Sequence, residues 1–209
     1  MSGWGTQHVR HGKIWSYLTV TNTKKDTTKE SLYGPISVDV WHKASQIKLV
    51  IFDVDGVFSD GRIYLSNSGE ELKAFHTRDG FGVKSLLNAG FELAVITGRK
   101  SQLLEKRMTA LGVNRIYQGI DNKLVPFESL LSELKLTADQ VAYIGDDMVD
   151  LPVMQHVGLS VCVADGHPYV KQQTDMVTYM KGGYGAVREL SDLILQSQGL
   201  FESAQGMSV

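Results

Sequence analysis

The sequence predicts an α/β protein built on a doubly wound parallel sheet, and three observations support this fold class. Residues 47–52 form a nearly continuous apolar run, rich in Val and Ile, which suits a strand buried on both faces of a parallel sheet. Similar short runs recur later in the chain and are separated by segments of helical length. The first run ends abruptly in the polar residue Asp53, and the later ones also lead into polar motifs. This alternation predicts βα repeats around one sheet.

The N-terminal segment differs from the rest of the chain. Residues 1–31 are rich in Thr, Lys, Ser and Gly and have no sustained hydrophobic period. We expect an N-terminal extension there: a disordered arm, an upstream translation extension or a short ordered appendage. Residues 32–209 are long enough for a single domain with one core. A short helical face at residues 38–45 is expected to lead into the first strand.

A β-hairpin is expected directly after the first strand. It covers residues 62–77, with a turn at residues 66–69. A helix over residues 80–88, capped by Asp79, should follow. The next strand is expected at residues 91–96. One hairpin and one helix are too little for a lid domain, so we expect no cap over the sheet.

The remaining elements continue the alternation of strands and helices. Ser101 is expected to cap a helix that ends at Gly112. Later strands are expected at residues 115–118, 141–144 and 159–163 and near residue 177. Later helices are expected at residues 122–134, 151–156, 168–173 and 185–196.

Composition excludes several classes of protein. The net charge is −2, with 21 Lys and Arg against 23 Asp and Glu and no basic block, which argues against nucleic acid as the main partner. The single cysteine, Cys162, rules out an intrachain disulfide and lies in an apolar run typical of a core. No apolar stretch approaches the roughly 18 residues of a membrane span, and the first residues lack the apolar region of a secretory signal. We therefore expect a cytoplasmic protein without a membrane partner.

Two carboxylates follow the first strand, and they are the first candidates for chemistry. In open α/β sheets, ligands bind outside the carboxyl ends of the strands, where Asp53 and Asp55 are expected. Two close carboxylates resist joint ionisation, and a bound Mg2+ would remove that conflict. The functional interpretation is a nucleophile and an acid/base partner beside a metal. The alternative is a polar turn after a core strand.

Other strand ends add groups that phosphoryl transfer needs. Thr97 follows the second strand, Lys123 begins the helix after the third, and Asp146, Asp147 and Asp150 follow the fourth. Carboxylates hold a divalent cation, a hydroxyl at a helix start binds phosphate, and a lysine neutralises charge on the transferred group. Taken singly, each has an ordinary alternative as a helix-start, N-cap or solvated residue. The prediction depends on their conjunction at one rim.

These motifs resemble the four motifs of the haloacid dehalogenase superfamily of phosphohydrolases. The segments that carry the resemblance are Asp53-Val54-Asp55-Gly56-Val57, Ile96-Thr97-Gly98-Arg99, Lys123 and Gly145-Asp146-Asp147-Met148-Val149-Asp150. The missing cap and two further segments resemble the cap-less members that act on a keto-sugar acid phosphate. Those segments are Phe75-His76-Thr77-Arg78-Asp79-Gly80-Phe81-Gly82 and Gly182-Gly183-Tyr184-Gly185-Ala186-Val187-Arg188-Glu189. The resemblance covers residues 33–209.

The resemblance implies a mechanism and a metal site. Asp53 is the nucleophile that forms an aspartyl-phosphate, and Asp55 protonates the leaving oxygen and then activates water. Mg2+ is held by Asp53, by the backbone carbonyl of Asp55 and by Asp146, and Asp150 orients these groups from behind. Thr97 and Lys123 bind the phosphoryl oxygens.

The resemblance also implies the substrate and the assembly. It suggests hydrolysis of an eight-carbon keto-sugar acid phosphate in lipopolysaccharide precursor synthesis, by a homotetramer built on the hairpins. Besides Asp55 and Lys123, the positions it suggests for substrate binding are His76, Thr77, Arg78, Asp79, Gly80, Lys84, Arg99 and Arg107. Without the resemblance, Lys84 and Arg107 would be taken as solvated helix charges. Residues 200–209 are a candidate to reach a neighbouring site.

Other functions stay open on the sequence. A broader sugar-phosphate phosphatase, a nine-carbon keto-sugar acid phosphatase or a phosphomutase would use the same fold. A non-catalytic oligomerisation module belongs to another class, but the complete set of motif residues argues against it. A receiver domain also phosphorylates an aspartate, but the late Gly145-Asp146-Asp147 motif does not suit it.

Overall fold

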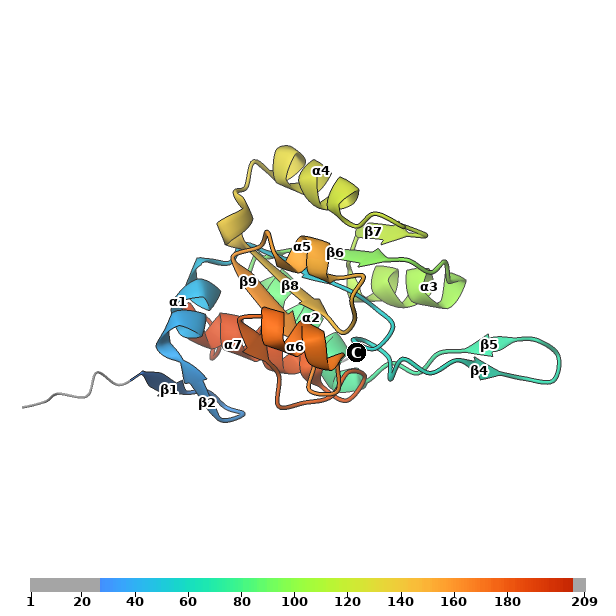
Figure 1. Cartoon of the computed structure of the whole chain (residues 1–209), viewed down its shortest axis with the longest axis horizontal. Helices are drawn as coiled ribbons and strands as arrows, with labels where there is room; N and C mark the ends of the chain where they lie inside the picture. The colour runs from blue at the N-terminus through green and yellow to red at the C-terminus, as the bar shows by residue number, and fades with distance from the viewer. Residues whose placement is uncertain (1–26, 205–209) are drawn as a thin grey trace, which may run out of the picture.

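The structure is a computed structural model that describes residues 27–204. Its centre is a six-stranded, all-parallel sheet in the order β10-β9-β8-β3-β6-β7 (Figure 1). The strands of this sheet are β3 Leu49–Phe52, β6 Glu92–Thr97, β7 Arg115–Gln118, β8 Val141–Gly145, β9 Leu159–Cys162 and β10 Met176–Val177. The predicted fold class, a doubly wound parallel sheet, is confirmed.

Strand β3 lies in the middle of the sheet because its residues can be buried on both faces. All four are 0% exposed. Phe52 is in register with Val95 of β6 on one side and with Ile144 of β8 on the other. Parallel strands in register end at the same edge. The residues that follow β3, β6 and β8 therefore meet at one rim of the sheet.

Helices cover both faces of the sheet. Val50 and Phe52 pack into the cluster formed with α1 Val38–Gln46, α2 Thr77–Asn88, α3 Gln102–Leu111 and α7 Ala186–Ser197. Leu49 and Ile51 pack into the opposite cluster, formed with α4 Leu124–Leu134, α5 Leu151–Met154 and α6 Pro168–Gln173. A short 3-10 helix, η1 Ala138–Gln140, precedes β8. No helix between residues 27 and 204 combines the length and apolarity needed to cross a membrane.

The start of α2 differs from the prediction. The helix begins at Thr77, and its N-cap is His76, whose Nδ1 accepts a hydrogen bond from the Arg78 N–H at 3.0 Å. Asp79, the predicted cap, is instead fully buried inside the first turn, where it accepts a hydrogen bond from the backbone N–H of Arg188 at 2.9 Å. The prediction was wrong because a long-range contact with α7 uses the carboxylate that a local argument assigned to capping.

Two small hairpins lie outside the central sheet. The first pairs β1 Thr28–Glu30 with β2 Pro35–Ser37, so the last residues of the expected extension are paired with the domain. The second, predicted after the first strand, pairs β4 Tyr64–Leu65 with β5 Glu71–Leu72 and projects away from the body (Figure 1). Residues 1–26 of the expected extension, and residues 205–209 of the tail, lie outside the described residues.

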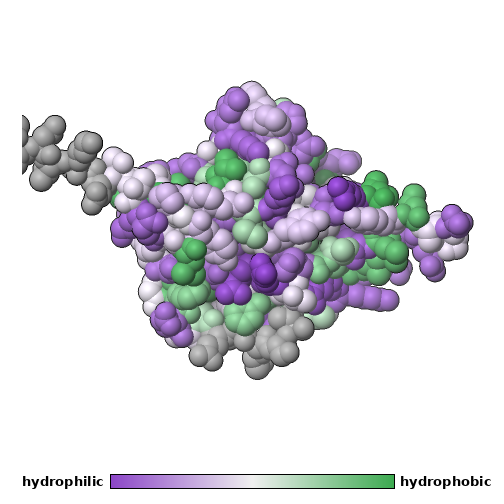
Figure 2. Space-filling view, turned by 90° about the horizontal axis from the view of Figure 1, so that it is seen from below, coloured by the Kyte–Doolittle hydropathy of each residue, from purple (hydrophilic) through white to green (hydrophobic). Residues whose placement is uncertain are grey.

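The projecting hairpin carries apolar side chains into solvent. Ile63, Leu65 and Leu72 are 58%, 68% and 61% exposed. In Figure 2 the hairpin points to the right, and hydrophobic side chains are visible on and beside it. Large apolar side chains exposed in this way make the hairpin a candidate interaction surface.

Candidate active site

A cleft of about 430 Å³ opens at the carboxyl edge of the sheet. It gathers six of the predicted site residues: Asp53, Asp55, Thr97, Arg99, Lys123 and Asp146. Its other lining residues are Gly61, Gly98, Ile120, Asp121, Asp147 and Val149. The polar motifs of four strand ends therefore meet around one cavity, as the topology predicts.

Glycines allow the loop after β3 to approach the loop after β8. Gly56 has φ +85°, and a Cβ placed there would lie 2.1 Å from Oδ2 of Asp146. A side chain at this position would therefore displace the carboxylate. Gly182 closes the loop from its other side, and the N–H of Gly183 donates to the carbonyl of Val57 at 2.8 Å. These contacts explain why the two segments need glycine at these positions.

Lys123 bridges two buried carboxylates at the centre of the site. Its Nζ lies 2.7 Å from Oδ1 of Asp53 and 2.7 Å from Oδ1 of Asp150. The side chains of Lys123, Asp53 and Asp150 are 3%, 8% and 0% exposed. A buried ammonium held between two carboxylates stays charged, so the site carries a fixed cation beside Asp53.

Asp150 has all its hydrogen-bonding capacity in use. Oδ1 accepts from Lys123 and, at 2.6 Å, from the hydroxyl of Tyr143. Oδ2 accepts from the backbone N–H groups of Asp146 and Asp147 at 3.0 and 3.2 Å. These bonds fix the turn that presents Asp146 to the cleft. Asp150 thus orients the backbone of Asp146 and Asp147. This arrangement fits the role expected for Asp150, which is to orient the metal ligands from behind.

Burial and mutual repulsion shift the pKa values of the site. Burial, followed by the charge of Asp150, raises the pKa of Asp53 to about 7, although Lys123 opposes the rise. Burial, then Asp150 and Asp53, raises the pKa of Asp146 to about 8. Burial disfavours the charged form of Lys123, but Asp53 and Asp150 outweigh it, so the pKa of its ammonium is raised. Lys123 alone therefore does not compensate the negative charge of the three carboxylates, and a bound cation would supply the missing positive charge.

The carboxylate group fits a divalent cation. Carboxylate oxygens of Asp53, Asp146 and Asp150 lie within 4.8 Å of one another. Hard oxygen donors suit Mg2+. Since Asp150 is saturated by its hydrogen bonds, Asp53 and Asp146 are the two carboxylates free to bind the ion directly.

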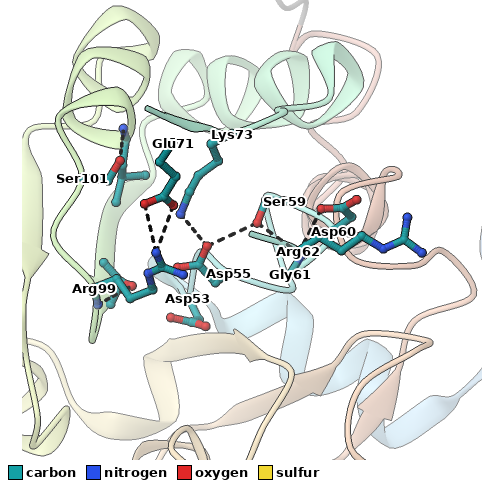
Figure 3. Close-up of polar contacts among 12 residues, drawn as sticks. Asp53, Asp55, Ser59, Asp60, Gly61, Arg62, Glu71, Lys73, Arg99 and Ser101 are labelled. Atoms are coloured by element: carbon teal, nitrogen blue, oxygen red, sulfur yellow. Dashed lines mark hydrogen bonds and ion pairs between the residues drawn. The ribbon is translucent and has the colours of Figure 1, made fainter. Parts of the chain in front are cut away.

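Two more predicted residues lie at the end of β6. Thr97 is 2% exposed, and its Oγ1 accepts from the Arg99 N–H at 3.4 Å. The guanidinium of Arg99 binds both carboxylate oxygens of Glu71 at 3.0 Å, as Figure 3 shows. Arg99 thus lies in the cleft, already paired with a carboxylate from the hairpin.

The other predicted substrate-binding positions do not line this cleft. They belong to α2, with its N-cap, and to α3: His76, Thr77, Arg78, Asp79, Gly80, Lys84 and Arg107. Asp79 and Gly80 are buried, and Thr77 and Arg78 are exposed. Their role in substrate binding stays a prediction.

Sequence reasoning missed two residues of the site. Lys73, at the base of the hairpin, forms an ion pair with Oδ1 of Asp55 (Figure 3). Tyr143 lies fully buried in the middle of β8 and bonds Asp150. Tyr143 could have been found, because a tyrosine inside an otherwise aliphatic strand needs a partner for its hydroxyl. Lys73 gave no local signal.

A parallel sheet with a lysine-bridged aspartate pair at its carboxyl edge fits the class of haloacid dehalogenase-like hydrolases. Residues 115–189 match the family described as haloacid dehalogenase-like hydrolase. The chain is 51% identical to the 3-deoxy-D-manno-octulosonate 8-phosphate phosphatase of Escherichia coli K12 over 187 residues, which cover 90% of this chain and all of the relative. It therefore belongs to the 3-deoxy-D-manno-octulosonate 8-phosphate phosphatase family of haloacid dehalogenase-like hydrolases.

Solved structures agree with this assignment. The phosphatase of the same name from Yersinia pestis superposes with a TM-score of 0.85 at 51% identity and covers 87% of this chain and 98% of its own. The Moraxella catarrhalis enzyme, solved in complex with magnesium ion, phosphate ion and KDO, gives a TM-score of 0.77 at 40% identity. That match covers 79% of this chain and 95% of the other. The resemblance expected from the motifs is confirmed.

Proposed function

We propose that this chain hydrolyses 3-deoxy-D-manno-octulosonate 8-phosphate to the free sugar acid and phosphate, with Mg2+, in lipopolysaccharide precursor synthesis. The observation that carries the proposal is the buried bridge from Lys123 to Asp53 inside the cleft. It provides a nucleophilic carboxylate beside a fixed cation, the pair that an aspartyl-phosphate mechanism needs. The substrate in this proposal is inferred from the family to which the chain belongs.

The predicted catalytic and metal-binding residues of the cleft each have a role in this mechanism. Asp53 attacks phosphorus, and Asp55 gives a proton to the leaving sugar oxygen and later takes one from water. Lys123 and the hydroxyl of Thr97 hold the phosphoryl oxygens. Asp53 and Asp146, with the backbone carbonyl of Asp55, would hold Mg2+, which supplies positive charge for the phosphoryl group.

Recognition of the sugar acid requires more cations than one cleft offers. Arg99 suits a carboxylate, because a guanidinium binds carboxylates through two parallel hydrogen bonds. We assign the remaining contacts to His76, Thr77, Arg78, Asp79, Gly80, Lys84 and Arg107. Since these residues do not line the cleft of their own chain, we infer that they would complete the site of a neighbouring subunit.

A homotetramer built on the projecting hairpins meets that need. The hairpin exposes Leu65 and Leu72 and has short edge strands that can pair with another copy. Burying these side chains between subunits would bring a second protomer against the open rim. The absence of a lid domain between Asp55 and Thr97 in the described chain makes such a cover useful, because it excludes water from the aspartyl-phosphate. We place this enzyme in the cytoplasm.

Phosphate release tests the proposal. The wild type and Asp53→Asn would be assayed with Mg2+ on eight-carbon and nine-carbon keto-sugar acid phosphates and on simple sugar phosphates. We expect the highest kcat/KM on the eight-carbon acid, and a loss of at least about 10³-fold in Asp53→Asn. Asp39→Asn, an exposed site on α1, is the matched control. Preference for another member of the panel would refute the substrate, and activity in Asp53→Asn would refute the nucleophile.

A further inference from the structure

The two oxygens of the Asp55 carboxylate have different surroundings. Oδ1 pairs with Nζ of Lys73 and lies 3.5 Å from the Ser59 hydroxyl, which donates to it. Oδ2 is buried and, within residues 27–204, has no hydrogen-bond partner. Asp55 as a residue lines the cleft. One oxygen is therefore held by two protein groups, and the other, although it is shielded from solvent, keeps its hydrogen-bonding capacity unused.

Lys73 reaches Asp55 from outside the central sheet. It follows β5 at the base of the hairpin, and its side chain is 3% exposed although the hairpin itself is largely solvated. Figure 3 shows Lys73 and Glu71 pointing from the hairpin toward Asp55 and Arg99. In the described part of the chain, Lys73 and Ser59 are not among the residues that line the cleft. Lys73 thus contacts Asp55 rather than the space where substrate binds.

We propose that Lys73 is a positioning residue for proton transfer: it holds Oδ1 of Asp55, so that Oδ2 is the oxygen that exchanges the proton with the leaving group and with water. The inference rests on the proposed function, since it gives Asp55 the acid/base role. It adds a residue outside the four motifs to the machinery of the reaction. It also makes the hairpin part of the active site of its own subunit.

The two chemical steps define what Lys73 would affect. In the first, an Asp53 oxygen bonds to phosphorus, the bond from phosphorus to the leaving oxygen breaks, and that oxygen takes the proton from Oδ2. In the second, a water oxygen bonds to phosphorus, its proton moves to Oδ2, and the bond from phosphorus to Asp53 breaks. Misplacing Oδ2 slows departure of a poor leaving group, which needs the proton. A good leaving group departs without it.

This difference distinguishes a positioning role from a structural one. A structural lysine would affect all substrates alike, because the folded enzyme would be scarcer or the phosphoryl site distorted. A lysine that bound substrate would raise KM for the sugar acid alone. Only loss of proton transfer makes the defect grow as the leaving group becomes more basic. The parameter to compare is kcat/KM, which covers the steps up to departure of the leaving group.

The experiment uses the full chain with Mg2+ and four proteins: wild type, Lys73→Met, Lys73→Arg and Lys48→Met. Lys48→Met is the matched control, because Lys48 is exposed and precedes β3, at the opposite end of the strand from Asp53. Substrates are the sugar acid phosphate and a series of substituted phenyl phosphates from p-nitrophenyl to unsubstituted phenyl. Thermal unfolding of each variant confirms that it is folded at the assay temperature, and Lys73→Gln replaces Lys73→Met if it is not.

We expect Lys73→Met to lose about 30-fold or more in kcat/KM on the sugar acid phosphate, and less than about threefold on p-nitrophenyl phosphate. Across the phenyl series its rate should fall more steeply with leaving-group basicity than that of the wild type. Lys73→Arg, which keeps the charge, should recover part of the loss, and Lys48→Met should match the wild type. Equal losses on all substrates by a folded variant, or no loss, would overturn the proposal. The phenyl series needs no sugar-acid recognition, so it tests Lys73 even if the proposed substrate fails.

Discussion

Gly182 packs directly against Gly56: a Cβ on Gly182 would lie 1.6 Å from the carbonyl oxygen of Gly56. Two segments 126 positions apart in the chain are thus in backbone contact, and the contact bears on the loop that carries Asp55. Because the nearest atom is backbone, no side chain can rotate away to make room. The C-terminal part of the fold therefore sets the position of the catalytic loop after β3.

Substituting Gly182 by alanine should therefore impair catalysis more than stability. The added methyl must displace the backbone at Gly56, which lies so close to Asp146 that a Cβ on Gly56 would be 2.1 Å from Oδ2 of Asp146. A misplacement of about 1 Å can cost on the order of 10²-fold in rate, so we expect Gly182→Ala to lower kcat by about that factor. Steady-state kinetics and thermal unfolding measure the two effects.

Gly90→Ala is the control, since a Cβ at Gly90 meets nothing within 4 Å and brings only the strain of its φ of +88°. A fully active Gly182→Ala enzyme would contradict the packing argument.

The buried carboxyl of Asp79 should make the stability of the fold depend on pH. Burial raises the pKa of Asp79 from 3.8 to about 6, against the hydrogen bond from the Arg188 N–H, which lowers it. The folded state then binds its proton more tightly than the unfolded state. This contribution is complete below about pH 4 and is lost as the pH rises through about 6, by up to ~3 kcal/mol. Urea unfolding of wild type and Asp79→Asn between these pH values tests it.

The asparagine variant keeps an oxygen that accepts from the Arg188 N–H but cannot ionise. The difference in unfolding free energy between Asp79→Asn and wild type should therefore grow in favour of the variant as the pH rises from 4 to 7. An identical slope in both proteins would show that Asp79 does not carry the dependence. Asp139→Asn, at an exposed position in η1, gives the baseline for an Asp substitution.

Sequence reasoning succeeded where the signal was local or periodic. The run that forms β3, the Gly that ends α3 and the polar strand ends each follow from a short stretch of chain, and topology then brings the strand ends together. It failed where a contact depended on a distant segment. Asp79 was assigned to capping because nothing in the neighbouring sequence indicates its hydrogen bond to the backbone of Arg188, 109 positions away. Lys73 looked like any lysine of a hairpin until the fold placed it on Asp55.

Removing the metal should affect stability as well as activity. Asp53, Asp146 and Asp150 crowd their carboxylates within 4.8 Å, so a divalent cation should stabilise the folded state by binding there. We expect EDTA to abolish hydrolysis, Mg2+ to restore it, and added Mg2+ to raise Tm. Burial, followed by the charges of Asp150 and Asp53, raises the pKa of the Asp146 carboxyl to about 8, and Asp146→Asn removes this carboxyl. This variant should be at least as stable as wild type in EDTA but should lose the rise in Tm. A variant that retains the rise would exclude Asp146 as a ligand.

The exposed hairpin gives a prediction that links assembly to catalysis. Leu65 and Leu72 lie on its two strands, where Leu65 pairs with Glu71 and Leu72 pairs with Tyr64, and they are 68% and 61% exposed. If they are buried between subunits, replacing both with aspartate places two charges in an apolar interface and should convert the assembly to monomers of 23.1 kDa. Light scattering after size exclusion measures the mass. If the neighbouring chain supplies cations that bind the sugar acid, as proposed, the monomer should also show a raised KM for that substrate, while activity on p-nitrophenyl phosphate changes less. Val38→Asp is the control, since Val38 is also exposed but begins α1, where a negative charge is favoured. A double variant that keeps the wild-type mass would rule out the hairpin as the interface.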